Sequence, residues 1–211
     1  MRNGLVMFCV AVAMAALWSC APGPSPAGKA AEKSAAKAAV APADAAKWGC
    51  VGGMTVRRDD APVKNTADKE VYLTERYGLT AYRIPAKNGS YAVKLHFAET
   101  YEGVDEAGKR LFSVRIEGQP VLPNLDVYKE AGNQRFAAIV KPFDTEVKDG
   151  ELTIEFQENV QKTMVNGIEV LGKPGAPTTG FELRIDCGAD ADYKDKAGHV
   201  WKKDQEFKAQ P

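Results

Sequence analysis

Two carboxyl groups are the first candidates for chemistry in this sequence. Glu99 and Asp126 could be cast as the acid and base of a glycoside hydrolase, a reaction that needs two carboxyl groups about 5 to 10 Å apart across a sugar-sized cleft. Nothing in the sequence makes them converge, and structural hydrogen bonding is the simpler role for both. The two histidines, His96 and His199, accompany no recognisable nucleophile motif. We therefore predict that the protein is not an enzyme.

Three aspartates, Asp190, Asp192 and Asp195, lie in a glycine-flanked loop whose spacing is faintly similar to a calcium loop. Such a loop closes with a bidentate Glu at its twelfth position, but Trp201 stands twelfth counting from Asp190. This favours a solvated turn, and the sequence predicts neither a metal site nor a cofactor.

The cysteines bear on disulfide chemistry and on export. Only Cys50 and Cys187 of the four cysteines fall in the region expected to fold. Outside the reducing cytoplasm they could form one disulfide. They could equally be two separate buried thiols, because their distance in space does not follow from the sequence.

An export signal is predicted at residues 1–20. Arg2 precedes an apolar run, Gly4 to Trp18, that is too short for an ordinary membrane-spanning helix. The run ends in Leu-Trp-Ser-Cys, which resembles the lipobox of bacterial lipoproteins and would make Cys20 the lipidated residue. Ordinary cleavage nearby, with Cys20 left as a plain thiol, is the alternative. We expect an exported lipoprotein that is anchored in a membrane by its N-terminal lipid and faces the periplasm or the cell exterior.

Composition separates a linker from the body of the chain. Residues 21–47 are almost entirely Ala, Pro, Lys, Gly and Ser, which lack the large apolar side chains that a packed core needs, so they are predicted to be a disordered tether. The whole chain has 28 basic and 28 acidic residues and no basic block. Nucleic acid is therefore not an expected partner.

Residues 48–172 have the pattern of β-strands. Apolar side chains alternate with polar ones in 91–97, 111–116 and 151–156, and the turn pairs Asn-Gly and Asp-Gly precede two of these runs. Val165 to Leu171 and Phe181 to Ile185 are further candidate strands. Because no helical stripe follows Trp48, the sequence predicts an all-β antiparallel sandwich. The alternation assigns three tyrosines to the core or the sheet faces: Tyr72, Tyr82 and Tyr91.

A final segment follows a hinge of proline and glycine at 173–180. Residues 181–211 contain one good strand and two large aromatic residues, Trp201 and Phe207, but are too short to fold alone. This segment must therefore dock on something or stay disordered.

The body resembles the malectin domain, a carbohydrate-binding, jelly-roll-like β-sandwich. The resemblance rests on motifs that occur in one order along the chain: LTERY at 73–77, NGSYAVKLHFAETY at 88–101, KRLFSVRIEGQPVLPNLDVYKEAG at 109–132, DGELTIEF at 149–156 and VNGIEVL at 165–171. It implies a non-catalytic module in which sugar rings pack on aromatic side chains at one rim of the sandwich.

The order of one motif departs from the family. Malectin-like domains normally begin with a strand and loop similar to Arg184 to Phe207, which here stand last. A circular permutant explains this order, and so does a tandem array truncated early in its second copy. We prefer permutation, because domain termini often lie close together. The same segment could instead complete a neighbouring molecule, which would be self-association by domain swapping.

The resemblance also implies the binding residues. Tyr77 and Tyr101 match binding tyrosines of the family. Glu102 stands where the endoplasmic-reticulum lectin that carries this domain often has an aromatic residue, and Gln161 stands where a loop of the family carries an acidic one. Trp48 and Tyr193 are loop aromatics that could line the same rim.

We expect a carbohydrate-binding module on a tether that recognises oligo- or polysaccharide weakly and gains firm attachment from many copies on one membrane. The alternative from another class is a structural lipoprotein that uses the sandwich and the last segment for assembly without sugar.

Overall fold

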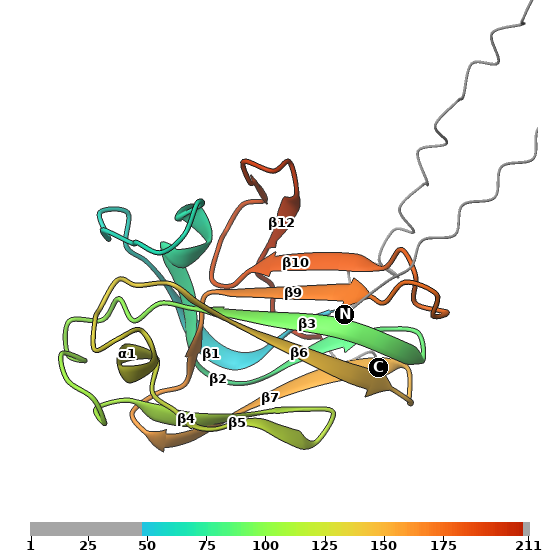
Figure 1. Ribbon diagram of the computed structural model, residues 1–211, viewed down its shortest axis with the longest axis horizontal. Coiled ribbons are helices and arrows are strands. Elements are labelled where there is room, and N and C mark those ends of the chain that lie inside the picture. The colour runs from blue at the N-terminus through green and yellow to red at the C-terminus, as the bar shows by residue number, and fades with distance from the viewer. Residues whose placement is uncertain (1–47, 209–211) are drawn as a thin grey trace, which may run out of the picture. The chain divides into compact units, whose positions relative to one another are not determined.

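The computed structural model describes residues 48–208, which form two β-sheets packed face to face (Figure 1). The predicted signal peptide, Cys20 and the tether lie outside the described residues. The first sheet has the strand order β1-β2-β7-β4-β5, and β8 pairs with β2. Its strands are β1 (Gly49–Arg57), β2 (Thr74–Pro85), β4 (Leu111–Ile116), β5 (Gln119–Leu125), β7 (Glu151–Val160) and β8 (Met164–Val165).

The second sheet has the order β11-β12-β10-β9-β3-β6. Its pairs are antiparallel except β10 with β12, which run parallel. Its strands are β3 (Gly89–Phe97), β6 (Ile139–Val147), β9 (Gly167–Gly172), β10 (Glu182–Asp186), β11 (Tyr193–Lys194) and β12 (Val200–Lys203). The helical elements described are the 3-10 turn η1 (Glu70–Tyr72) and the short helix α1 (Val127–Glu130). The predicted all-β sandwich is confirmed.

The period-two alternation places the apolar side chains as predicted. Every second residue is buried against the opposite sheet in β4, in β3 from Tyr91 to Phe97 and in β7 from Leu152 to Phe156. Gly150 precedes β7 with φ +89°, a left-handed conformation that glycine adopts without strain. The inward set is Tyr91, Val93, Leu95, Phe97, Phe112, Val114, Ile116, Leu152, Ile154 and Phe156.

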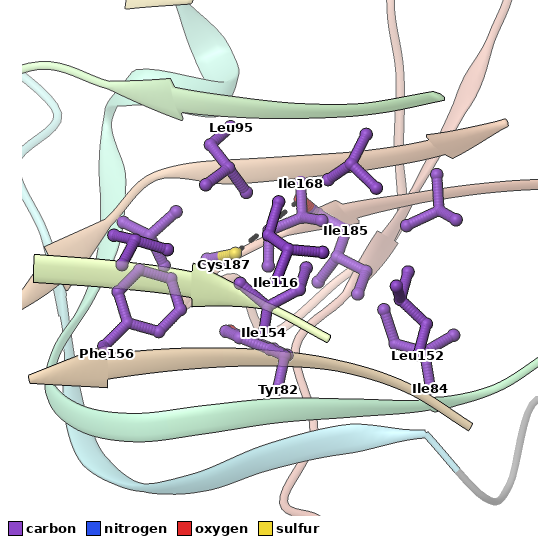
Figure 2. Packing of buried hydrophobic residues seen from close by; sticks show 14 of the residues in the cluster. Tyr82, Ile84, Leu95, Ile116, Leu152, Ile154, Phe156, Ile168, Ile185 and Cys187 are labelled. Carbon is purple, nitrogen blue, oxygen red and sulfur yellow. Dashed lines mark hydrogen bonds between the residues drawn. The ribbon is translucent and has the colours of Figure 1, made fainter. Parts of the chain in front are cut away.

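Side chains from both sheets meet in one core (Figure 2). Tyr82 and Ile154 of the first sheet lie opposite Ile168 and Ile185 of the second. Tyr72, Tyr82 and Tyr91 are buried, which confirms their assignment. Trp48 is only 4% exposed and belongs to this core. Its suggested place at the rim was wrong, because Trp48 directly precedes β1 and packs into the core.

The two cysteines of the folded region are both buried and both free, so the disulfide considered above is not formed in this structure. Cys50 Sγ donates to the Gly52 carbonyl at 3.2 Å, and both thiols interact with the Tyr82 hydroxyl. Burial raises the pKa of Cys50 to about 12 and raises that of Cys187 as well. Both therefore act as small apolar side chains of the core.

The last segment completes the sandwich of its own chain. β10 pairs with β9 over five residues, and β12 lies beside β10. The chain then reaches the first sheet, where Cys50 N donates to the Gln205 carbonyl and Phe207 N donates to the Cys50 carbonyl, each at 2.8 Å. This docking is the geometry that a circular permutant requires and gives no support to exchange between copies. The origin of the motif order stays a prediction.

A buried ion pair fastens this segment to β2. Arg76 Nε donates to Asp204 Oδ2 at 2.8 Å, and the two side chains are 6% and 2% exposed. Asp204 also accepts from the Tyr82 hydroxyl at 3.0 Å and from Gly188 N at 2.8 Å. The carboxylate thus joins the end of the chain to β2 and to the turn after β10.

Across the described part of the chain, no helix has the length and apolar character needed to cross a membrane.

Candidate carbohydrate-binding site

A hollow of about 290 Å³ opens at one rim of the sandwich, close to the lower limit of ordinary ligand pockets. Three of the four residues that the resemblance implied line it together: Tyr77 on β2, Tyr101 after β3, and Gln161 after β7. They are far apart in sequence and converge only in the fold. The remaining lining residues are Val56, Arg58, Glu75, Arg110 and Lys162.

Tyr101 provides the exposed aromatic surface of the site. Tyr101 is 43% exposed, which is unusual among the large hydrophobic residues that the structure describes. The ring packs over Gly103, where an added Cβ would lie 2.4 Å from the ring carbon Cε1. The Arg110 guanidinium lies over the ring, 6.0 Å from its centroid. These contacts hold the ring in place while leaving surface on which a sugar can stack.

Tyr77 lies inside β2 rather than in a loop. Its backbone pairs with Met54 on one side and Met164 on the other, and its hydroxyl donates to Met54 Sδ at 3.7 Å. Glu75 stands two residues earlier and therefore points to the same face of the strand. The strand, not a flexible loop, positions this part of the site.

A buried ion pair supports the floor of the hollow. Arg110 Nε lies 2.9 Å from Glu99 Oε2, and these side chains are 5% and 0% exposed. Glu99 Oε1 accepts from Tyr101 N at 3.0 Å, and Arg110 Nη1 donates to the Lys162 carbonyl at 3.2 Å. Burial raises the pKa of Glu99 to about 7, although the charge of Arg110 opposes this shift.

A second charged group forms the wall. Arg58 Nη1 lies 3.3 Å from Glu75 Oε1 and donates to Thr100 Oγ1 at 3.0 Å. Thr100 in turn donates to Glu75 Oε2 at 3.2 Å. Glu75 and Thr100 thus hold Arg58, whose side chain is 28% exposed and keeps further N–H donors.

Glu102 lies in a neighbouring hollow that shares Arg58 and Tyr101 with the first. Tyr101 thus stands between the two hollows, and Glu102 lines the second one. Gln161 has a left-handed backbone, φ +64°, and its side-chain Oε1 accepts from Lys162 N at 3.1 Å.

Two other residues discussed in the sequence analysis, Asp126 and Tyr193, stabilise the fold and do not line the rim hollow. Asp126 caps α1 by accepting from Lys129 N at 3.0 Å and also accepts from Gly108 N at 2.7 Å. Tyr193 donates its hydroxyl to Asp68 and packs in a second cluster of buried side chains. Its prediction as a rim residue was wrong, because the last segment carries it to the outer face of the second sheet.

Sequence reasoning missed the charged residues of the hollow. The sequence does contain a signal for Arg110. It lies two residues before Phe112 and four before Val114, so the alternation points its side chain inward, and it is only 4% exposed. An arginine at an inward position needs a buried partner, which here is Glu99. Arg58 and Lys162 carry no comparable signal, because each is placed by a turn.

Stability should depend on pH through Glu99. The folded protein holds the Glu99 proton up to about pH 7, whereas the unfolded chain releases it near the ordinary value of 4.5. Folding is therefore favoured by this group at low pH, and the contribution, about 3 kcal/mol, is lost as pH rises from 4.5 to 7. Urea unfolding at several pH values should show a smaller decline for Glu99→Gln than for the unmodified protein. Equal declines in both proteins would contradict this assignment.

A β-sandwich that carries a supported aromatic surface in a rim hollow has the features of a carbohydrate-binding module. The family model described as "Malectin domain" matches residues 33–178, more than half of the sequence. The chain therefore belongs to the malectin domain family, which is a family of carbohydrate-binding modules.

Several curated proteins are similar over part of their length. Malectin-A from Xenopus laevis is 32% identical over 94 residues, which cover 43% of this chain and 33% of that protein. Receptor-like protein 4 from Arabidopsis thaliana is 36% identical over 84 residues, which cover 39% of this chain and 13% of that protein. The chain thus spans a third or less of these relatives.

Solved structures agree with the fold. A β-glucuronidase from Bacteroides uniformis matches 63% of this chain and 15% of its own, with a TM-score of 0.55 and 27% identity. The extracellular domain of ANXUR1 from Arabidopsis thaliana matches 58% of this chain and 39% of its own, with a TM-score of 0.51. At 16% identity the second match shows the fold alone.

Proposed function

We propose that this protein binds oligo- or polysaccharide without modifying it, in the rim hollow that contains Tyr77, Tyr101 and Gln161. The observation that carries the proposal is the convergence of these three residues, from three separate segments, on one hollow. Tyr101 offers a ring face for the apolar side of a pyranose, and Arg58 and Lys162 offer donors to its hydroxyls.

The departures from the family concern specificity. Glu102 removes one aromatic contact and adds a charge beside Tyr101, while Gln161 replaces an acidic acceptor by a neutral group that both donates and accepts. A sugar in this site therefore stacks chiefly on Tyr101 and makes polar contacts that differ from those expected in the endoplasmic-reticulum lectin of the family.

A glycan array tests the proposal. The protein applied to it is the fragment 21–211, which lacks Cys20. We expect binding by the unmodified fragment and at least a tenfold loss for the double variant Tyr77→Ala, Tyr101→Ala. The matched control is Val140→Ala, which removes a similarly exposed apolar side chain from β6 in the other sheet. Circular dichroism must show that all three proteins are folded. A folded fragment that binds no glycan, or a double variant that binds as well as the control, would refute the proposal.

We further propose that the module is displayed outside the cytoplasm by lipidation of Cys20, with residues 21–47 as the tether. The lipobox-like sequence supports this, and the tether would let several copies engage one polysaccharide. In a bacterial host we expect the full chain in the membrane fraction and Cys20→Ser in the soluble exported fraction. A Cys20→Ser protein that stays in the membrane fraction would rule out the lipid anchor.

A further inference from the structure

A second hollow, of about 570 Å³, lies on the outer face of the second sheet and shares no lining residue with the rim site. Its floor is formed by Lys94 and His96 of β3, Glu169 of β9 and Arg184 of β10. Its walls are two segments: residues 66–72 on one side and 195–201 on the other. Figure 1 shows that the segment before β2 and the hairpin of β12 both rise from this side of the sheet. The last segment thus creates the hollow by docking.

The carboxylates of this hollow are already occupied by donors of the protein. Asp195 accepts from Ala197 N and His199 N through Oδ1, and from His199 Nδ1 and Trp201 Nε1 through Oδ2, at 2.8 to 3.1 Å. Asp68 accepts from the Tyr193 hydroxyl and from Lys196 N. A ligand that only donated hydrogen bonds would find little to bind on either group.

Glu169 is occupied in the same way. Its Oε1 accepts from His96 Nε2 at 3.0 Å, and its Oε2 accepts from Arg184 Nε at 3.0 Å. Burial alone would raise the pKa of Glu169, but the hydrogen bond and charge of His96, with Lys94 and Arg184, lower it to about 2. The group is thus ionised at neutral pH and fully engaged with its neighbours.

The cations of the hollow retain donor capacity. An ammonium group has three donors, and within residues 48–208 the Lys196 amine bonds to the Ala67 carbonyl at 2.7 Å. The Lys94 amine makes one long contact, 3.4 Å to Glu169 Oε1, and its side chain is 41% exposed. Formal charges in the lining balance, since Lys94, Lys196 and Arg184 face Asp68, Glu169 and Asp195. A preference for ligands that accept hydrogen bonds therefore comes from the unused N–H donors of the lysines, since the carboxylates beside them are already occupied.

Rigid aromatic groups frame these donors. Trp201 lies edge-on to His96 with ring centroids 5.3 Å apart, and the Tyr72 hydroxyl lies 2.8 Å from His96 Nδ1. Val71 and Tyr72 add apolar surface on the opposite wall. A ring-shaped ligand with a charged substituent fits a hollow that combines such walls with two lysines, Lys94 in its floor and Lys196 in a wall.

We propose that this hollow is a second saccharide site, specific for acidic sugars, in which Lys94 and Lys196 bind the carboxylate of a uronic acid. The site goes beyond the rim hollow and uses none of its residues. The chain would then carry two sites of different chemistry on one module, and a polysaccharide with neutral and acidic units could engage both.

Calorimetric titration with tetragalacturonate tests this proposal, and its fully methyl-esterified form provides a neutral ligand of the same backbone. We expect the acid form to bind at least tenfold more tightly than the ester. Lys94→Gln with Lys196→Gln should weaken binding of the acid at least tenfold, because two charge-assisted contacts are lost. The matched control is Lys141→Gln with Lys148→Gln, which removes the same charge from β6 and the turn after it and should bind like the unmodified protein.

The rim variant Tyr77→Ala, Tyr101→Ala separates the two sites. It should bind the acid form normally, even if it has lost neutral glycans. Three results would overturn the proposal: no binding of the acid form, equal binding of acid and ester, or equal losses in the two lysine pairs. Loss of acid binding in the rim variant alone would assign the acidic sugar to the rim hollow instead.

Discussion

Replacing Asp204 by alanine is expected to lower the free energy of unfolding by about 3 to 5 kcal/mol. The carboxylate is 2% exposed and accepts from Arg76 Nε, the Tyr82 hydroxyl and Gly188 N. Without it, a buried guanidinium, a hydroxyl and an amide lose a partner at once, and each buried unsatisfied group is unfavourable. Urea unfolding monitored by tryptophan fluorescence should measure the loss.

Asp192→Ala is the matched control, because it removes the same group from the same segment. Asp192 pairs with Lys202 at 2.8 Å, and the side chains are 45% and 40% exposed. Water can replace this pair, so we expect a loss of less than about 1 kcal/mol. Similar losses in the two variants would show that the last segment does not depend on its buried carboxylate.

The same contact makes the last segment part of the folding unit. Asp204 connects β2 and the turn after β10, while Gln205 and Phe207 hydrogen-bond to both sides of Cys50 in β1. The two sheets are therefore joined at this edge by the C-terminal chain. This explains why a segment too short to fold alone is ordered here.

The two-sheet architecture could be predicted from the sequence, because each strand shows its own alternation of apolar and polar residues. Tyr91, Leu95 and Phe97 follow a local rule that requires no knowledge of the partner strand. Trp48 follows no such rule: a large aromatic after a polar linker can face the core or the solvent. Only the pairing of β1 with β2 settles its direction, and that contact is distant in sequence.

The rim site was predictable only as far as the family motifs reach. Tyr77, Tyr101 and Gln161 lie in or near those motifs and do converge. Arg58 and Lys162 owe their positions to turns whose direction depends on the packed sheets. The second hollow could not have been predicted, because it exists only when residues 195–201 meet β3 and β9.

Arg110→Met should have an effect on stability that depends strongly on pH. Methionine fills a similar space without the charge, so Glu99 loses the cation 2.9 Å away while staying fully buried. At pH 8 the folded protein must either keep an unpaired buried carboxylate or bind a proton that the unfolded chain does not hold. We expect a loss of about 3 to 5 kcal/mol under these conditions.

At pH 5.5 the same substitution should lower stability by less than about 2 kcal/mol. Burial already raises the pKa of Glu99 to about 7, and removal of Arg110 raises it further, so the group is protonated and neutral in both folded proteins. What remains is the lost hydrogen bond to the Lys162 carbonyl and some packing.

Arg115→Met provides the comparison, since Arg115 lies on the same strand but is exposed and contacts the Gly118 carbonyl at 3.3 Å. Its effect should stay below about 1 kcal/mol and change little between pH 5.5 and pH 8. A large loss for Arg110→Met that is equal at both pH values would mean that Arg110 acts through packing and not through the Glu99 charge. A pH-dependent loss would instead establish that the charge of Arg110 offsets the burial of the Glu99 carboxylate above pH 7. Acidification then protonates Glu99 and leaves Arg110 as the charged group beneath Tyr101.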